Sequence, residues 1–171
     1  MRYRVTAPKM KVRGFVAPKD TLLVDYNERT VRLPWRTVRP LIACAFVHVK
    51  REALRQHGPE YVRRQQRWPH VLRIGKSSRS WWGRACGYHA KVFIGNLHEE
   101  PVLQRYPRFK EMPEFWINNW REQLVGLTAH ELWHRWSPAP NGKAQEYDCE
   151  LVEWDAVDRW RSLNGNHEAN R

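Results

Sequence analysis

One cluster in the sequence combines residue types and a spacing that suit chemistry, namely His130-Glu131-Leu132-Trp133-His134. On an α-helix, residues i and i+4 lie on one face, so both imidazoles can reach the same ion. Imidazole suits Zn²⁺, and bound Zn²⁺ lowers the pKa of a water molecule toward ~7. Glu131 can take a proton from that water as general base and pass it to a leaving amine as general acid. The motif therefore predicts one Zn²⁺ ion and hydrolysis of peptide bonds in a protein or peptide substrate.

A third protein ligand has to come from elsewhere, because zinc hydrolases of this kind bind their ion through three side chains and leave one position open. After the motif the next histidine is His167, close to the end of the sequence. The helix expected from about 144 to 163 offers carboxylates instead. Glu146 lies in its first turn, nearest to the loop that returns from the motif, and is the expected ligand. Glu150 and Asp148 stay open as alternatives.

The elements that must position these residues follow from the hydrophobic spacing. Helices are expected over 41–56, 60–67, 114–136 and 144–163, with Gly58-Pro59 ending the first and 137–142 ending the third. Strands are expected over 11–16, 21–25, 30–33, 70–75 and 89–95, with a hairpin turn at 27–29 and a loop over 34–40. This mixture predicts an α+β fold with a small mixed or antiparallel sheet.

Composition limits the class of protein. The chain has 171 residues, 42% of them hydrophobic, which suits one domain with a real core. No apolar run is long enough to span a membrane, and no secretory signal is apparent. Three widely spaced cysteines argue against a disulfide framework and for a reducing cytoplasm. We expect residues 1–69 to be a basic N-terminal part of the same domain, 70–163 to carry the chemistry, and 164–171 to form a flexible tail.

Charge suggests a second activity. The net charge is +12, and the positive charge lies in residues 1–91, whereas residues 92–171 are slightly acidic. Between Arg51 and Arg84, cationic side chains alternate with Tyr61, Trp68, Trp81 and Trp82, a mixture that suits phosphates and unstacked bases. Nucleic acid is therefore a possible partner. The alternative to an enzyme is a basic nucleic-acid-binding protein in which the metal region is structural or degenerate.

The acidic segment Gln145-Glu146-Tyr147-Asp148-Cys149-Glu150 resembles the E-x-x-x-D element of gluzincins, the thermolysin-like zinc proteases. The resemblance implies a minimal zincin-like fold in which His130, His134 and Glu146 bind zinc. It also implies that Glu150, four residues after the ligand, hydrogen-bonds a zinc-binding histidine. The region is similar as well to short intracellular and phage-encoded zincin-like metallopeptidases, in which a comparable acidic helix closely follows H-E-x-x-H.

A weaker similarity is to SprT-like proteases, which place a Trp-Gly-rich turn and a strand before the motif helix, as do 82–87 and 89–95 here. In zincins that strand is the edge that pairs with an extended substrate peptide, and SprT-like proteases act on DNA-bound proteins. Outside the motif, His89, His98 and Tyr147 are candidates to stabilise an oxyanion, although each is expected mainly as a packed or surface residue. Cys149 is expected in the core.

Overall fold

The computed structural model describes residues 1–67, 70–77, 80–86, 89–104, 109, 112, 114–138 and 142–164. Its centre is a five-stranded mixed sheet in the order β1 (Arg2–Ala7), β4 (Asp20–Tyr26), β5 (His70–Lys76), β7 (His89–Ile94) and β6 (Trp82–Cys86). β4, β5 and β7 run parallel, and β1 and β6 are antiparallel edge strands. Two small hairpins join β2 (Met10–Val12) to β3 (Phe15–Ala17), and β8 (Val102–Gln104) to β9 (Phe115–Ile117).

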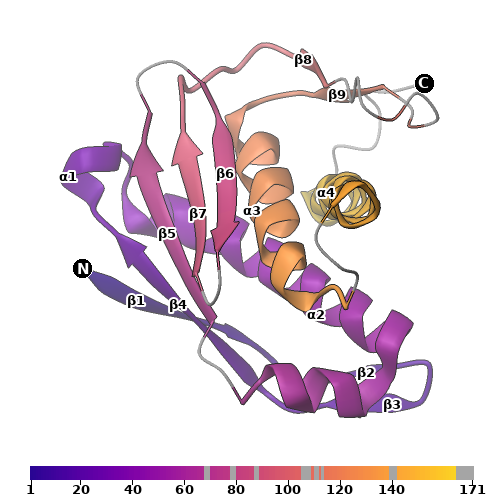
Figure 1. The fold of residues 1–171 in the computed structure, drawn as a ribbon. Coiled ribbons are helices and arrows are strands. Elements are labelled where there is room, and N and C mark those ends of the chain that lie inside the picture. Colours follow the sequence, from indigo (N-terminus) through magenta and orange to yellow (C-terminus); the bar gives the residue numbers. More distant parts are fainter. Residues whose placement is uncertain are drawn as a thin grey trace.

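Four helices complete the structure: α1 (Glu28–Val31), α2 (Trp35–Gln65), α3 (Trp120–Trp136) and α4 (Lys143–Asn164). In Figure 1, α2 passes behind the sheet, α3 lies beside β6, and α4 packs against α3. Alternate residues of β4, β5 and β7, such as Val24, Leu72 and Val92, are buried in one core with the helices. The expected α+β class with a mixed sheet is confirmed.

Residues 1–69 and 70–163 share this sheet, because β4 pairs in parallel with β5 across that boundary. The predicted tail begins at Asn164, which is the last residue of α4, and its remaining residues 165–171 lie outside those described. Cys44, Cys86 and Cys149 are all free thiols. No helix among the described residues is long and apolar enough to cross a membrane.

The first long helix differs from the expectation of a loop over 34–40. α2 already begins at Trp35, with Pro40 inside it. A proline there removes one hydrogen bond, but Val38, Leu41 and Ile42 are fully or almost fully buried, so packing holds these turns in place. The predicted break at Gly58 is confirmed, because its φ of 77° is not helical and interrupts α2 there.

Three predicted elements near the hairpins are wrong. The strand expected over 11–16 is interrupted at residues 13 and 14, which form the turn between β2 and β3. Residues 27–33 do not form a hairpin turn and strand, because the Asn27 side chain accepts hydrogen bonds from the backbone N–H groups of Arg29 and Thr30 and starts α1. The motif helix does not begin at 114. Residues 115–117 form β9, and Asn119 caps α3 at its true start in the same way.

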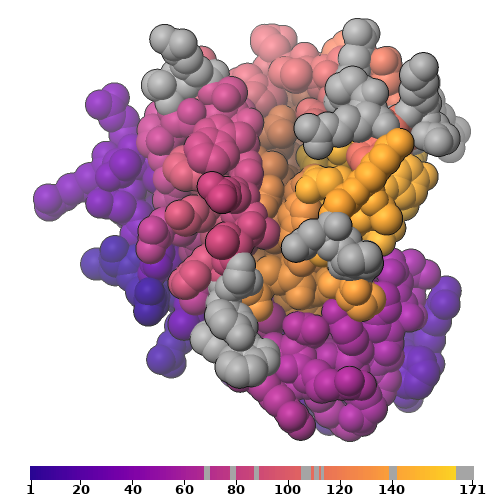
Figure 2. All heavy atoms as spheres, in the orientation of Figure 1, coloured from indigo at the N-terminus to yellow at the C-terminus, as the bar shows by residue number. Residues whose placement is uncertain are grey.

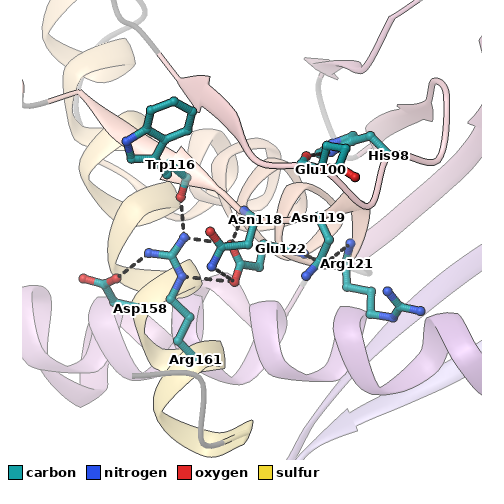
Figure 3. A network of polar contacts seen from close by, with 9 residues as sticks. All are labelled: His98, Glu100, Trp116, Asn118, Asn119, Arg121, Glu122, Asp158 and Arg161. Carbon is teal, nitrogen blue, oxygen red and sulfur yellow. Dashed lines mark hydrogen bonds and ion pairs between the residues drawn. The ribbon is translucent and has the colours of Figure 1, made fainter. Parts of the chain in front are cut away.

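A buried ionic network ties the beginning of α3 to the end of α4 (Figure 3). Arg161 of α4 donates to both carboxylate oxygens of Glu122 in α3, at 3.1 and 2.7 Å, and also to the carbonyl oxygen of Trp116. The Glu122 side chain is fully buried and accepts further from Asn118. Asp158 lies 3.4 Å from the guanidinium on its exposed side. The network fixes the angle at which α4 crosses the motif helix.

Candidate metal centre

The two motif histidines lie on adjacent turns of α3, with their ring centroids 5.1 Å apart. The opposite face of the helix is buried, including Leu124, Val125 and Leu132, so the helix cannot turn the histidines away from the neighbouring α4. His130 and His134 keep 13% and 15% of their side-chain surface exposed. Both rings are therefore packed and still reachable from solvent.

Glu146 of α4 completes the pair. One oxygen of its carboxylate lies 3.5 Å from His130 Nε2, and the other lies 3.5 Å from His134 Nε2. The carboxylate thus spans the two imidazoles, in the place where a third metal ligand would stand. The contact joins the last turns of α3, which carry the two histidines, to the first turn of α4, which carries Glu146.

The other ring nitrogens are held by acceptors. His130 Nδ1 lies 3.1 Å from Glu153 Oε2, and His134 Nδ1 lies 3.3 Å from Gln145 Oε1. The Gln145 side chain also donates a hydrogen bond from Nε2 to the backbone oxygen of His134. This second contact orients the amide so that Oε1 of Gln145 faces the His134 ring. A carboxylate and an amide oxygen only accept, so both Nδ1 atoms carry the proton. In the neutral rings, each Nε2 then presents a lone pair toward Glu146.

This arrangement differs from the expectation for Glu150. The carboxylate on His130 Nδ1 belongs to Glu153, which lies seven residues after Glu146 and therefore on the same side of α4. The other open candidate, Asp148, is turned toward α2, where its charge interacts with His57. Burial raises the pKa of Asp148. Of the three acids considered from the sequence, Glu146 is the one between the two Nε2 atoms.

The Glu131 side chain lies on the side of α3 that faces the edge strand β6, whereas the two histidines face α4. Its side chain is 4% exposed, and its Oε2 is buried with no hydrogen-bond partner among the described residues. A methyl group on Gly83 would lie 2.5 Å from Glu131 Cδ, so only glycine leaves room for this carboxylate. Burial raises the pKa of Glu131 to about 7, and His130 opposes this rise while Glu146 and Glu153 add to it.

The histidines differ in their affinity for a proton. Burial alone would lower the pKa of His130, but hydrogen bonds to Glu146 and Glu153 outweigh it and raise the value to about 10. Burial and the neighbouring charge of His130 lower the pKa of His134. A metal cation that binds both Nε2 atoms replaces the proton of His130, so binding would release protons.

Cys149 is a further neighbour that could donate to a metal. Its sulfur and nitrogen atoms of His130 and His134 lie within 4.8 Å of one another, which makes these three residues a possible metal-binding group. The thiol is fully buried in the core, as expected from the sequence, and burial raises its pKa. Only a thiolate binds metal well, so burial disfavours Cys149 in this role relative to the carboxylate of Glu146.

These groups line a pocket of about 390 Å³ between β6 and α4. In Figure 2, orange atoms of α3 form the floor of a hollow between the pink strands and the yellow helix α4. The lining consists of three residues of β6, three of α3, two of α4 and the glycine that precedes α4: Gly83, Arg84, Ala85, His130, Glu131, His134, Gln145, Glu146 and Gly142.

The three candidates for an oxyanion role do not line this pocket. His89 lies on the face of β7 that points away from α3, opposite Cys86 of β6. His98 contacts the carbonyl oxygen of Glu100 through Nδ1, at 3.0 Å. The ring of Tyr147 packs edge-on against Phe109. Each is a packed or surface residue, as the sequence mainly suggested.

Sequence reasoning assigned no role to three members of the site. Glu153 is one of the acids that the expected helix offers, on the same flank as Glu146 and Glu150, but this spacing alone does not show that it meets a histidine. Gln145 and Gly83 carry no such signal, since an amide and a glycine occur in many roles.

No protein-family model matches this sequence, and a search of the curated proteins returns no match.

Proposed function

We propose that the protein is a zinc-dependent metallopeptidase whose ion is held by His130, His134 and Glu146. The observation that carries the proposal is the single carboxylate placed 3.5 Å from both Nε2 atoms. Two imidazoles and one carboxylate are a donor set that suits zinc and leaves one coordination position for a substrate or water. The second row of contacts, Glu153 and Gln145 on the two Nδ1 atoms, orients the rings for this role.

When bound, zinc would act as a Lewis acid and would lower the pKa of a water molecule toward ~7. The chain itself supplies the proton transfer. Glu131 presents a buried carboxylate oxygen without a described partner, in the same pocket as the two imidazoles. With a pKa of about 7, its carboxyl group can both take up and release a proton near neutral pH. We assign it the role of general base and then general acid.

A peptide substrate is favoured by the position of β6. This strand is the outermost of the sheet, with β7 on one side, and its residues Gly83 to Ala85 line the pocket. The outer side of an edge strand offers N–H and C=O groups that can pair with an extended peptide. A peptide paired with β6 would pass directly over Glu131, which packs against Gly83.

The proposal is tested by measuring zinc content and hydrolysis together. Purified protein is expected to hold close to one zinc ion by elemental analysis and to cleave unfolded casein or a quenched fluorescent peptide library. Glu131→Gln should keep the zinc and lose the cleavage, because the amide cannot accept the proton. Glu146→Ala should lose zinc, whereas Asp148→Ala, on the same helix, should keep it. Protein that neither contains nor binds zinc would refute the assignment.

A further inference from the structure

The five-stranded sheet has one face that α2, α3 and α4 leave uncovered. It is turned toward the reader in Figure 1, with α2 behind the strands. The inward side chains, such as Val5, Leu72 and Ala90, belong to the core, and the alternate side chains point to the uncovered side. We call the latter set the outer sheet face. The register of the sheet shows which residues of this face lie opposite one another on adjacent strands.

A row of charged side chains crosses the outer sheet face through all five strands, in the order Arg2, Asp25, Arg73, Lys91 and Arg84. Four neighbouring spacings of ~4.8 Å make the row roughly 19 Å long. Asp25 is the only acid in it, and it pairs with Arg2 at 2.7 Å and with Arg73 at 3.7 Å. An open hollow of about 480 Å³ lies beside these three side chains.

Positive charge is in excess at the other end of the row, because Asp25 is shared by Arg2 and Arg73 and forms no ion pair with Lys91 or Arg84. Arg73, Lys91 and Arg84 lie directly opposite one another on adjacent strands. Like charges placed opposite each other destabilise a sheet. Among the described residues, no carboxylate forms an ion pair with Lys91 or Arg84, or with Arg4 on the same face. Such an arrangement is tolerated at some cost in stability, and a polyanion would relieve it.

Aromatic rings lie beside this row on the same face. Phe93 sits over Gly75, where a methyl group would lie 3.0 Å from its ring, and Trp82 stacks on Phe93 with centroids 3.9 Å apart. Trp82 remains 45% exposed although it is one of the largest apolar side chains. An exposed indole next to Lys91 and Arg84 offers a surface on which a base can stack.

We propose that the outer sheet face binds single-stranded nucleic acid, with phosphates along the cationic row and a base stacked on Trp82. A single strand is favoured over a duplex because the bases of a duplex are already stacked on one another, whereas a flat sheet with an exposed ring takes unstacked bases. The inference does not rest on the proposed peptidase activity, since it needs no metal ion, and of its residues only Arg84 also lines the pocket of the histidines. Binding should therefore survive His130→Ala.

The experiment measures fluorescence anisotropy of a labelled oligo-dT of roughly 15 nucleotides, a length within the usual site sizes, with the full chain at low and rising salt. Four phosphate contacts would make log Kd change with log salt by a slope of about 3, since each contributes ~0.7 for a single strand. The double variant Arg84→Glu/Lys91→Glu should bind at least about tenfold more weakly and lose roughly half of this slope. Its melting temperature should change little, because the reversal places two carboxylates opposite each other in place of two cations, while Arg73 gains an opposite charge on the adjacent strand.

The matched control is Arg51→Glu/Arg64→Glu, which makes the same change in net charge at two exposed residues of α2. This control should bind within about twofold of the original protein, and Trp82→Ala should bind about fivefold more weakly or worse. Equal losses in both double variants would overturn the inference, because they would mean that overall charge alone attracts the strand. Binding to anionic vesicles or to duplex DNA in preference to oligo-dT would also overturn it.

Discussion

Gly83→Ala tests whether the contact between β6 and the motif helix positions the general base. The added methyl group would lie 2.5 Å from Glu131 Cδ and closer still to its Cγ and Oε1. Carbon atoms in contact normally stay roughly 3.5 Å or more apart. Either the carboxylate or the strand must therefore move by about 1 Å. No small rotation relieves the clash, since three atoms of Glu131 are involved.

The expected consequence is a selective loss of turnover. A displacement of about 1 Å at a reacting group can cost on the order of 100-fold in rate. Overpacking of a tight site typically costs about 1 to 3 kcal/mol of unfolding free energy, which leaves the fold intact if the protein has ordinary stability. Zinc content should be unchanged, because the three atoms nearest to the added methyl group all belong to Glu131 and none to His130, His134 or Glu146.

The assay compares hydrolysis of a quenched fluorescent peptide, zinc content and thermal unfolding for the original protein and the variants Gly83→Ala, Glu131→Gln and Gly75→Ala. Gly75→Ala is the matched control, because it adds a methyl group to β5, two strands away from β6, on the outer sheet face against Phe93. It should keep full turnover. If Gly83→Ala retains activity within about threefold while Glu131→Gln has lost it, the contact does not position the base. If Gly83→Ala loses its zinc, the substitution disturbs the whole metal centre, and the selective effect on Glu131 is refuted as well.

Three further predictions concern one contact of the metal centre, the buried ionic network and a buried histidine of α2. Glu153→Gln should weaken zinc binding about 10- to 100-fold in competition with a chelating dye, because the amide no longer fixes His130 as a charged acceptor does. Arg161→Ala should lower the unfolding free energy by about 3 to 5 kcal/mol in urea titrations, since it leaves the fully buried Glu122 without its cation. Burial lowers the pKa of His48 from 6.5 to about 4, so the folded protein binds this proton less readily than the unfolded chain. The stability due to His48 is full above pH ~6.5 and is lost as the pH falls toward 4, by up to about 1.4 kcal/mol per unit, and His48→Gln should flatten this part of the profile.

Each of these has an outcome that contradicts it. Glu150→Gln is the control for Glu153→Gln, and an equal loss of zinc affinity in both would remove the special role of Glu153. Asp158→Ala should cost far less than Arg161→Ala, because its contact is on the exposed side of the guanidinium. A pH profile of stability that is identical for the original protein and His48→Gln would mean that another group causes the acid sensitivity.

Local patterns predict the two helices that carry the candidate ligands, but not β6, because Trp82–Cys86 form a strand where a turn is expected. The i, i+4 spacing of His130 and His134 places both rings on one face of any helix, and both residues do lie in a helix, α3. The acidic helix was predicted over 144–163 and is found at Lys143–Asn164. The strands at 70–75 and 89–95 were also predicted, since alternation of buried and exposed residues is a local property of the chain.

Only the tertiary structure decided which groups meet across elements. Glu146, Glu150 and Glu153 are all plausible partners on the sequence, and the packing angle between α3 and α4 selects Glu146 for Nε2 and Glu153 for Nδ1. Gly83 is distant from Glu131 in sequence, and its role appears only where β6 crosses the motif helix. The excess of positive charge was visible in composition, but the register of five strands aligned part of it into one row. Long-range contacts depend on how elements pack, and no local periodicity encodes that arrangement.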